Sequence, residues 1–527
     1  MNNDVLGSNT VRPSLKDEFC VWSSAGKAAL EYDVSEEYLL PDYLPDIKKI
    51  LLVKAKIREN EPIIDDGKAE YGGSVTFFVV YQGDDGRVKS VSQSYPYTNY
   101  ISLDSIFDDS YIEAQTEVKN RSARAVSPRK LLLKAKVTTE ISVYNKLCVS
   151  PRLVGSSGIE DEFSLERSVD NIDCVNFFKI TENDIRVSED IEYKGSSPIS
   201  ELVWYDIDVC MTECKYTDGR LGIKGNGRLY CLLACSYDGE NITYDYIEKN
   251  LPIEFSSDAK LPIDSCMCYG NITVSAIECG VGVDSRGENR VIETDFVCRA
   301  DITGVVNEKT LFTNDVFSTA WAYENTYKPV NTERAVKCAC VNFSCDGKSP
   351  ELSAENGELD KIFMSNLESE IEAFEVVGDK GVFTGQCLVK ASLYDKTGGF
   401  TLTDFSFPVR YEMPLGEIGE ARALIQCRVL DSRVTFDGKS INANAELELT
   451  YAVFENITAN TVSQISIDRN TAANERNDKT MILYYPEAGE TLWSVAKKYG
   501  VARASIESAN NRKLTDVLPR VIVIPVK

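Results

Sequence analysis

Histidine is absent from the 527 residues of this chain. Nucleophilic enzymes of the Ser-His-Asp and Cys-His kinds need an imidazole as general base, and most catalytic zinc sites use imidazole ligands. The absence of histidine therefore excludes these classes. A phosphate-binding GxxxxGK[ST] motif is missing too, and the glycines between Gly222 and Gly227 lie in a hairpin-like segment, where they are expected to serve turns and bulges.

A glycan hydrolase is the enzyme class that these absences leave open, because two carboxylates suffice for its chemistry and the chain contains 82 Asp and Glu residues. None of these acids stands in a recognisable motif, and most occupy alternating positions, as on the solvated face of a sheet. We therefore expect a protein that is not an enzyme and that needs no cofactor.

Positive charge is scarce: 57 Lys and Arg residues oppose the 82 acids, which gives a formal net charge of −25. Such a chain repels nucleic acid unless its basic residues are segregated, and its most basic stretches, 54–58 and 121–136, lie in strand-like segments. Residues 1–19 carry acids and no apolar run, and no stretch approaches about 18 consecutive apolar residues. We expect no nucleic-acid binding, no secretory signal, no membrane span and a cytosolic location.

The 16 cysteines are scattered, and many stand in apolar, strand-like settings. Buried reduced thiols account for this pattern better than a disulfide framework does. Zinc is the alternative, suggested by the spacing of Cys210 with Cys214 and of Cys231 with Cys235. On a strand, residues four apart are separated by about 13 Å and alternate residues by about 6.6 Å, so these pairs, like the Cys-x-Cys pairs at 266 and 338, do not fit one ion. We expect no metal site.

Internal repetition is visible when glycines and prolines are used as register marks. The same spacing recurs in three sets, although Glu358 takes the place of the proline in the third. The sets are Pro45, Gly72 and Gly86; Pro198, Gly225 and Gly239; and Gly385 with Gly399. Between the paired glycines, apolar runs end in small turns, as in antiparallel hairpins. Each unit continues with two more alternating segments, typical of a sheet with one wet face.

These patterns predict a mainly β fold class, with three tandem sandwich-like or barrel-like repeats followed by a small α+β module. We expect the repeats at residues 16–146, 172–310 and 335–455. Polar segments at 147–171 and 456–480 are expected to be linkers, and the module is expected at 481–527.

The C-terminal module has its own pattern, with strands expected at 482–485 and 521–526 and helices at 491–499 and 503–510. The apolar positions of the first helix recur every three or four residues, and Thr491 stands at its N-cap. The turn Ala488-Gly-Glu-Thr-Leu-Trp493, the following Val-Ala-x-Lys-Tyr helix, the Ala-Asn helix end and the terminal Ile-Pro resemble the LysM family.

The LysM resemblance implies a βααβ fold with a shallow groove for glycans that contain N-acetylglucosamine. Where the family has a Pro-Gly turn before the last strand, this chain has Leu518-Pro-Arg520. Trp493 is either a ring on which a sugar stacks or a packing residue. Carried over by position, the groove is lined by Gly489, Glu490, Thr491 and Leu492 on one side and by Ala509, Asn510 and Asn511 on the other.

The first repeat resembles a second family. Glu31-Tyr-Asp-Val, Leu40-Pro-Asp-Tyr-Leu-Pro-Asp-Ile47 and Val53-Lys-Ala-Lys-Ile57 are similar to the opening of the SPOCS (spore-coat-associated) domain, and repeats that end in LysM resemble SipL-like coat morphogenetic proteins. This resemblance implies a scaffold on the forespore surface, made in the mother-cell cytoplasm, that docks on the basement-layer coat ATPase (SpoIVA-like). The alternative is a peptidoglycan-binding protein of the cell or spore wall.

Overall fold

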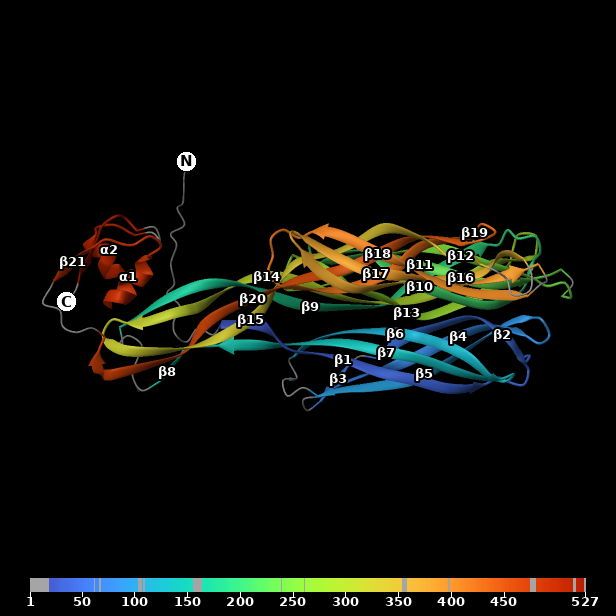
Figure 1. Ribbon diagram of the computed structural model, residues 1–527, viewed down its shortest axis with the longest axis horizontal. Helices are drawn as coiled ribbons and strands as arrows, with labels where there is room; N and C mark the ends of the chain where they lie inside the picture. Colours follow the sequence, from blue (N-terminus) through green and yellow to red (C-terminus); the bar gives the residue numbers. More distant parts are fainter. Residues whose placement is uncertain are drawn as a thin grey trace.

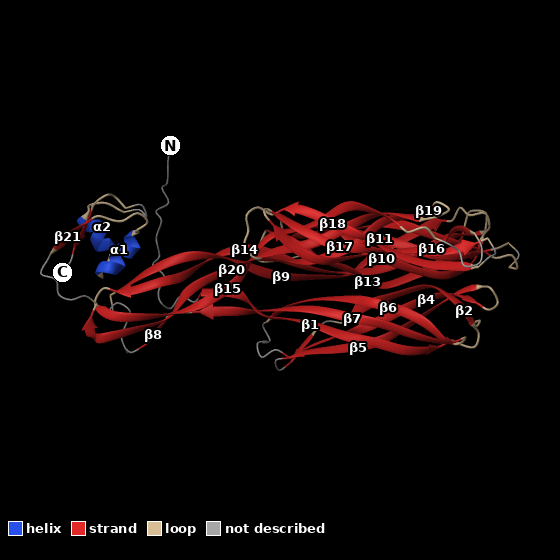
Figure 2. Cartoon of the chain, in the orientation of Figure 1, coloured by secondary structure: helices blue, strands red, loops and turns tan. Residues whose placement is uncertain are grey.

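The chain is built almost entirely from antiparallel β-strands (Figure 2). The computed structural model describes residues 19–60, 62–65, 68–102, 107, 110–154, 164–237, 239–259, 261–352, 358–396, 399–473, 480–514 and 518–525. In this part of the chain, no helix is long and apolar enough to cross a membrane. The expected mainly β fold class is confirmed.

Three units, called repeats 1 to 3, share one pattern of strand pairing. The first strand pairs with the last, the last pairs with the one before it, and the middle strands pair into a second ribbon. Repeat 1 comprises β1 (Phe19–Leu39), β2 (Ile47–Glu59), β3 (Ile63–Asp65), β4 (Lys68–Gly83), β5 (Val88–Ser102), β6 (Tyr111–Ser127) and β7 (Lys130–Val149). Repeat 2 comprises β9 (Leu165–Glu192), β10 (Ile199–Thr217), β11 (Arg220–Cys235), β12 (Thr243–Asp258), β13 (Ser265–Val283) and β14 (Asn289–Ser318). Repeat 3 comprises β15 (Trp321–Lys348), β16 (Leu359–Val377), β17 (Lys380–Asp395), β18 (Phe400–Pro414), β19 (Ala421–Phe436) and β20 (Ile441–Ala472).

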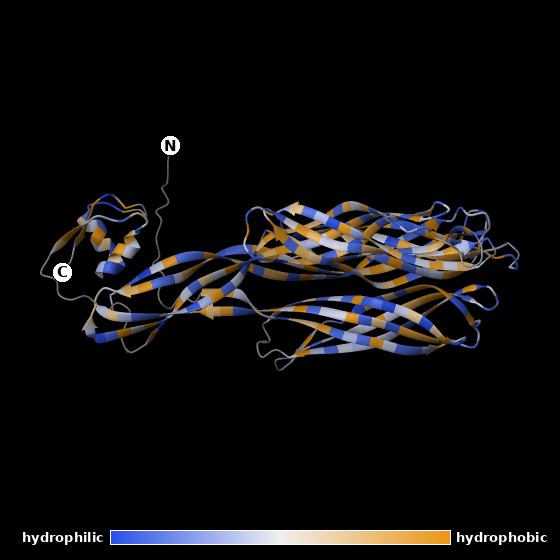
Figure 3. Ribbon diagram, viewed as in Figure 1, coloured by the Kyte–Doolittle hydropathy of each residue, from blue (hydrophilic) through white to orange (hydrophobic). Residues whose placement is uncertain are grey.

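Each repeat is therefore a sandwich whose two layers enclose an apolar core. In repeat 1 the layers are β1-β7-β6 and β2-β4-β5, and in repeat 3 they are β15-β20-β19 and β16-β17-β18. In repeat 2 a short pairing of β10 with β13 joins the layers into one folded sheet. Along many strands apolar and polar residues alternate, as Figure 3 shows, because one face of each layer packs inward.

In each ribbon, one position requires glycine because the backbones of two neighbouring strands approach each other closely there. The three are Gly73 in β4, Gly225 in β11 and Gly385 in β17, each opposite the neighbouring strand β2, β10 or β16. A Cβ there would lie 2.0 to 2.5 Å from a carbonyl oxygen of that strand, so only glycine fits. The expected marks Gly225 and Gly385 are confirmed, but the equivalent residue in repeat 1 is Gly73 and not Gly72. Spacing alone does not distinguish two adjacent glycines.

Paired β-bulges recur at the start of β2, β10 and β16 and turn one side chain of each strand toward the other repeats. The bulged residues Leu51, Val203 and Phe363 are buried and belong to one apolar cluster, which also contains their neighbours Leu52, Trp204 and Met364. Because the cluster takes residues from all three repeats, the repeats pack around a shared core.

Buried charge lies at the same junction. The Lys54 ammonium is 3.0 Å from carboxylates of both Asp206 and Asp208, and Lys56 is 2.6 Å from Asp206. Although burial lowers the pKa of Lys54, the two aspartates raise it above its ordinary value, so the side chain stays charged. Asn366, at the equivalent position of β16, is buried like Lys54 and Asp206.

Four long strands, β9, β14, β15 and β20, continue past the repeats and form an arm that ends at the C-terminal module (Figure 1). The short strand β8 (Arg152–Val154) lies parallel to β20 in this arm. Val316, Val462 and Ile465 are fully buried in it. The linker expected at 456–480 is therefore wrong over 456–472, which belong to β20. The linker expected at 147–171 is wrong over 147–149, 152–154 and 165–171, which belong to β7, β8 and β9. Residues 155–158, whose Gly-Ser-Ser-Gly sequence favoured that linker, lie outside the described residues.

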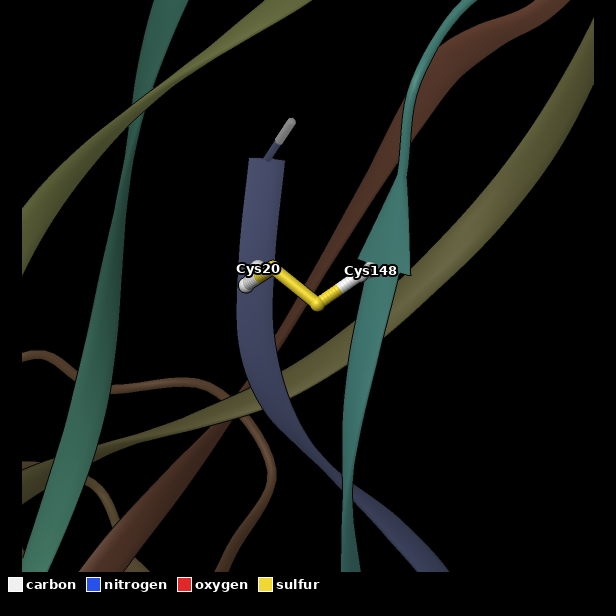
Figure 4. The surroundings of a disulfide bond; sticks show 2 residues. All are labelled: Cys20 and Cys148. Carbon is white, nitrogen blue, oxygen red and sulfur yellow. A yellow bond between two sulfur atoms is a disulfide. The ribbon is translucent and has the colours of Figure 1, made fainter. Parts of the chain in front are cut away.

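The expectation that the cysteines are reduced is wrong for one pair. Cys20 and Cys148 form a disulfide between β1 and β7 (Figure 4). They are direct partners in the antiparallel register, with Cα atoms 4.1 Å apart, although 128 residues separate them in sequence. Sequence could not show this, because the pairing follows from the closure of the first strand on the last. The other described cysteines are free, and each is buried or half-buried.

Candidate functional site

The C-terminal module consists of β21 (Met481–Tyr484), α1 (Leu492–Tyr499), α2 (Arg503–Ala509) and β22 (Ile522–Pro525). These bounds lie within one or two residues of those expected from the sequence. Thr491 starts α1 as a capping box: its hydroxyl accepts the Ser494 backbone N–H at 3.2 Å, and the Ser494 hydroxyl accepts the Thr491 N–H at 3.0 Å. Gly500 ends the helix with a φ of 60°.

The core of the module includes a residue from outside it. Leu492, Val495 and Ala496 of α1 pack with Ile506 of α2 and with β22. Phe317, near the end of β14, is fully buried in the same cluster. Its ring meets that of Trp493 edge-on, with the centroids 5.0 Å apart. The module is therefore packed against the arm.

Polar contacts surround this packing. The Asp315 carboxylate accepts the Trp493 indole N–H at 2.9 Å and pairs with the Lys497 ammonium at 2.6 Å. Arg503 pairs with Glu166 of β9 at 3.2 Å. Burial raises the pKa of Asp315, but the hydrogen bonds from Lys497 and Trp493 outweigh it and hold the pKa below its ordinary value. Asp315 is thus charged and fixed toward the module.

On the first side of the predicted groove, side chains serve the module's own fold. The Glu490 carboxylate accepts the Tyr484 hydroxyl at 2.7 Å and the Glu487 N–H at 2.8 Å. Thr491 is the helix cap, and Leu492 is a core residue. Gly489 has a φ of 91°, which favours glycine, and it is exposed. Of these four, Gly489 alone is exposed.

The second side is anchored in the same way. The Asn510 amide donates to the Ile506 and Val523 carbonyls, both at 2.7 Å, and its oxygen accepts the Val523 N–H at 2.9 Å. Its hydrogen-bonding capacity is therefore largely used within the module. Ala509 is half-buried, and Asn511 is exposed with a φ of 50°. The two sides are tied to one sheet, because Glu490 bonds β21 and Asn510 bonds β22.

Trp493, which the sequence left between sugar stacking and packing, is placed against the arm. Its ring contacts Phe317, its N–H is bonded to Asp315, and the Arg503 guanidinium lies 5.0 Å from the ring centroid. This ring is engaged by the protein's own residues.

Sequence reasoning missed the apolar outer face of β21. Ile482 and Tyr484 face the helices, while Met481, Leu483 and Tyr485 are 64%, 66% and 63% exposed. The signal was present, since Met481 to Tyr485 is an apolar run without the polar alternation of a surface strand. The face lies on a basic unit: residues 481–527 contain seven Lys and Arg against four Asp and Glu, and the rest of the chain contains 50 against 78. Contiguous exposed apolar side chains of this kind mark contact surfaces.

In the described part of the chain, no group of three or more Cys, Asp or Glu side chains is placed to hold a metal ion. The thiols of Cys266 and Cys268 lie 3.6 Å apart on one strand, and Cys268 also hydrogen-bonds with Cys214.

Comparison with known proteins gives one match. A family model described as SipL, SPOCS domain, matches residues 46–126, which run from the start of β2 to near the end of β6. No curated protein and no solved structure matches the chain. The match places a spore-coat-related domain in repeat 1.

Proposed function

We propose that this protein is a non-enzymatic scaffold of the spore coat, made in the mother-cell cytoplasm and assembled on the forespore surface. It docks to the basement-layer coat ATPase (SpoIVA-like) through its C-terminal module, which we take as a LysM domain, and through its repeats, which we take as tandem SPOCS domains. The match at residues 46–126 supports the coat assignment. The strand pairing shared by all three repeats supports its extension to repeats 2 and 3.

The observation that carries the proposal is that the residues of the predicted groove already make hydrogen bonds and packing contacts within the protein. Asn510 and Glu490 bond the module's own strands, Thr491 caps α1, and the half-buried Trp493 packs against the arm. A glycan groove needs free polar groups and an open ring to recognise a sugar. A module whose polar groups are already hydrogen-bonded within the protein is better suited to bind a protein partner than a glycan.

The exposed face of β21 is the part of the module that fits such a partner. Met481 and Leu483 lie on one side of the two-stranded sheet, and Tyr485 follows directly after it; their exposed apolar side chains are of the kind that anchor protein interfaces. The module's surplus of positive charge favours an acidic partner surface around these anchors.

The second candidate function is binding to peptidoglycan. It is favoured by the exposed positions of Gly489 and Asn511, one on each side of the predicted groove. Neither function requires an enzyme.

The test uses the full chain with Leu483→Asp, which places a charge in the exposed face of β21. Its matched control is Val283→Asp in repeat 2, since Val283 is 63% exposed and lies at the end of β13. Each protein is assayed for retention on the purified basement-layer ATPase and for pelleting with purified peptidoglycan. We expect Leu483→Asp to weaken retention at least tenfold and Val283→Asp to leave it unchanged.

Pelleting with peptidoglycan separates the two candidates. If the unaltered chain pellets and Asn511→Ala abolishes the pelleting, while neither aspartate substitution affects retention on the ATPase, the chain is a glycan receptor and the scaffold proposal fails.

A further inference from the structure

Two free cysteines of repeat 3 face each other across its core. Cys345 lies on β15 and Cys387 on β17, and these strands belong to different layers of the sandwich. Their sulfur atoms are 3.9 Å apart. A disulfide needs about 2.05 Å, so the sulfurs must approach by about 1.9 Å.

Repeat 2 contains a similar pair. Cys231 on β11 and Cys279 on β13 are hydrogen-bonded to each other, and the Cys279 thiol also lies 3.6 Å from the Thr294 hydroxyl. Strands β11 and β13 are not neighbours in the sheet, so this contact crosses the core as well. Repeat 1 has its own cysteine pair, the disulfide Cys20–Cys148.

We propose that Cys345–Cys387 and Cys231–Cys279 are oxidation sites at which a peroxide forms two disulfides, each joining the layers of one repeat. Every repeat would then carry one disulfide, which in repeat 1 links the neighbouring strands β1 and β7 of one layer and in repeats 2 and 3 joins the two layers. The proposal concerns modification of the chain and does not depend on its role in the coat.

Burial decides the order of the reaction at each pair. Cys387 and Cys231 are fully buried, whereas Cys345 and Cys279 are half-buried. The hydrogen bond from Cys387 lowers the pKa of the Cys345 thiol, and the bond from Cys231 does the same for Cys279. The more accessible thiol of each pair is thus also the one that more readily becomes the reactive thiolate.

The chemistry balances with hydrogen peroxide as oxidant. The Cys345 thiolate attacks one peroxide oxygen, the O–O bond breaks, and a sulfenic acid and hydroxide form; the hydroxide takes up the proton that Cys345 released and becomes water. The Cys387 sulfur then attacks the sulfenic sulfur, the S–O bond breaks, and a second water leaves with the proton of Cys387. Two thiols and one peroxide give one disulfide and two waters, and Cys279 with Cys231 follows the same course.

A third group of thiols differs in geometry. Cys266 and Cys268 are alternate residues of β13 with sulfur atoms 3.6 Å apart, so a bond between them would stay within one strand. Cys214 hydrogen-bonds with Cys268, and it lies on the strand β10 that pairs with β13. A Cys214–Cys268 bond would only link two strands that are already paired by backbone hydrogen bonds.

The experiment treats the full-length protein with hydrogen peroxide, blocks remaining thiols by alkylation and identifies cross-linked peptides by mass spectrometry without reduction. We expect two new cross-links, Cys345–Cys387 and Cys231–Cys279, each with the loss of two hydrogens, reversal by dithiothreitol and a higher urea midpoint of the oxidised protein. Cys345→Ala should remove the first cross-link alone, with Cys338→Ala as the matched control that removes neither.

The unaltered protein decides the outcome even if a variant fails to fold. Recovery of all four thiols in alkylated form, conversion of Cys345 or Cys279 to sulfinic acid, or cross-links at other pairs in place of these two would overturn the proposal.

Discussion

The contact of the C-terminal module with the arm depends on Asp315, and replacing this residue should release the module. Asp315 accepts the Trp493 N–H and pairs with Lys497, at 2.9 and 2.6 Å. A hydrogen bond to a charged group contributes about 2 kcal/mol, and a partly exposed ion pair about 1 kcal/mol. Asp315→Ala should therefore weaken docking by about 3 kcal/mol, which is roughly a 150-fold shift toward the undocked state.

Hydroxyl-radical footprinting read by mass spectrometry measures this shift. Phe317 is fully buried when the module is docked, so its labelling rate reports the undocked population. We expect faster labelling of Phe317 and Trp493 in Asp315→Ala and a smaller increase in Asp315→Asn, because the amide oxygen still accepts the Trp493 N–H. Asp33→Ala, at an exposed position of β1, is the control and should leave both rates unchanged.

Acid should mimic the substitution. Because the folded-state pKa of Asp315 is lowered, its contribution is complete above the ordinary value of 3.8 and is lost as the pH falls below that value. If Phe317 is labelled equally in Asp315→Ala and in the unaltered chain, apolar packing alone holds the module and the reasoning from the polar contacts is refuted.

Two further predictions concern the repeats. Gly225→Ala would place a Cβ 2.5 Å from the Cys210 carbonyl oxygen and should lower the free energy of unfolding, measured in urea, by about 1–3 kcal/mol. Gly222→Ala is the control: its Cβ would have its nearest neighbour at 4.0 Å, and it should lower the free energy of unfolding by less than about 1 kcal/mol. Equal losses in the two variants would contradict the close approach at Gly225. Burial raises the pKa of the Glu448 carboxyl to about 7 from its ordinary value of 4.5, so the folded state retains this proton longer than the unfolded state does, and stability should fall as the pH rises from about 4.5 to 7. The decline should be smaller in Glu448→Gln, and parallel pH profiles of urea midpoints for the two proteins would show that Glu448 titrates normally.

The elements of this chain were readable from its sequence, because each depends on local chemistry. Thr491 caps helix α1 as expected, and the helices and strands of the C-terminal module lie within one or two residues of their expected bounds. The register marks Gly225 and Gly385 were also found, because a backbone contact permits no other residue there.

Contacts between segments that are distant in the sequence could not be predicted from it. The burial of Phe317 in the module and its polar neighbour Asp315 depend on where the arm ends. The arm itself was mistaken for linker over 456–472, because its apolar residues, such as Val462 and Ile465, are sparse among polar ones. The apolar run before Glu487 was visible, but the outward direction of Leu483 follows only from the packing of the helices on the other side of β21.

The junction of the repeats has a consequence for how the chain is ordered. One strand position carries a lysine in repeat 1, an aspartate in repeat 2 and an asparagine in repeat 3, and Lys54, Asp206 and Asn366 are all buried. If the three repeats were identical, this position would carry the same residue three times, so the Lys54–Asp206 ion pair could not form. Burying an unpaired charge costs several kcal/mol. The repeats are therefore not interchangeable, because the buried residue at this position specifies the place of each repeat in the chain. A chain with the repeats in another order would form the same sandwiches, but they would not pack around one shared core.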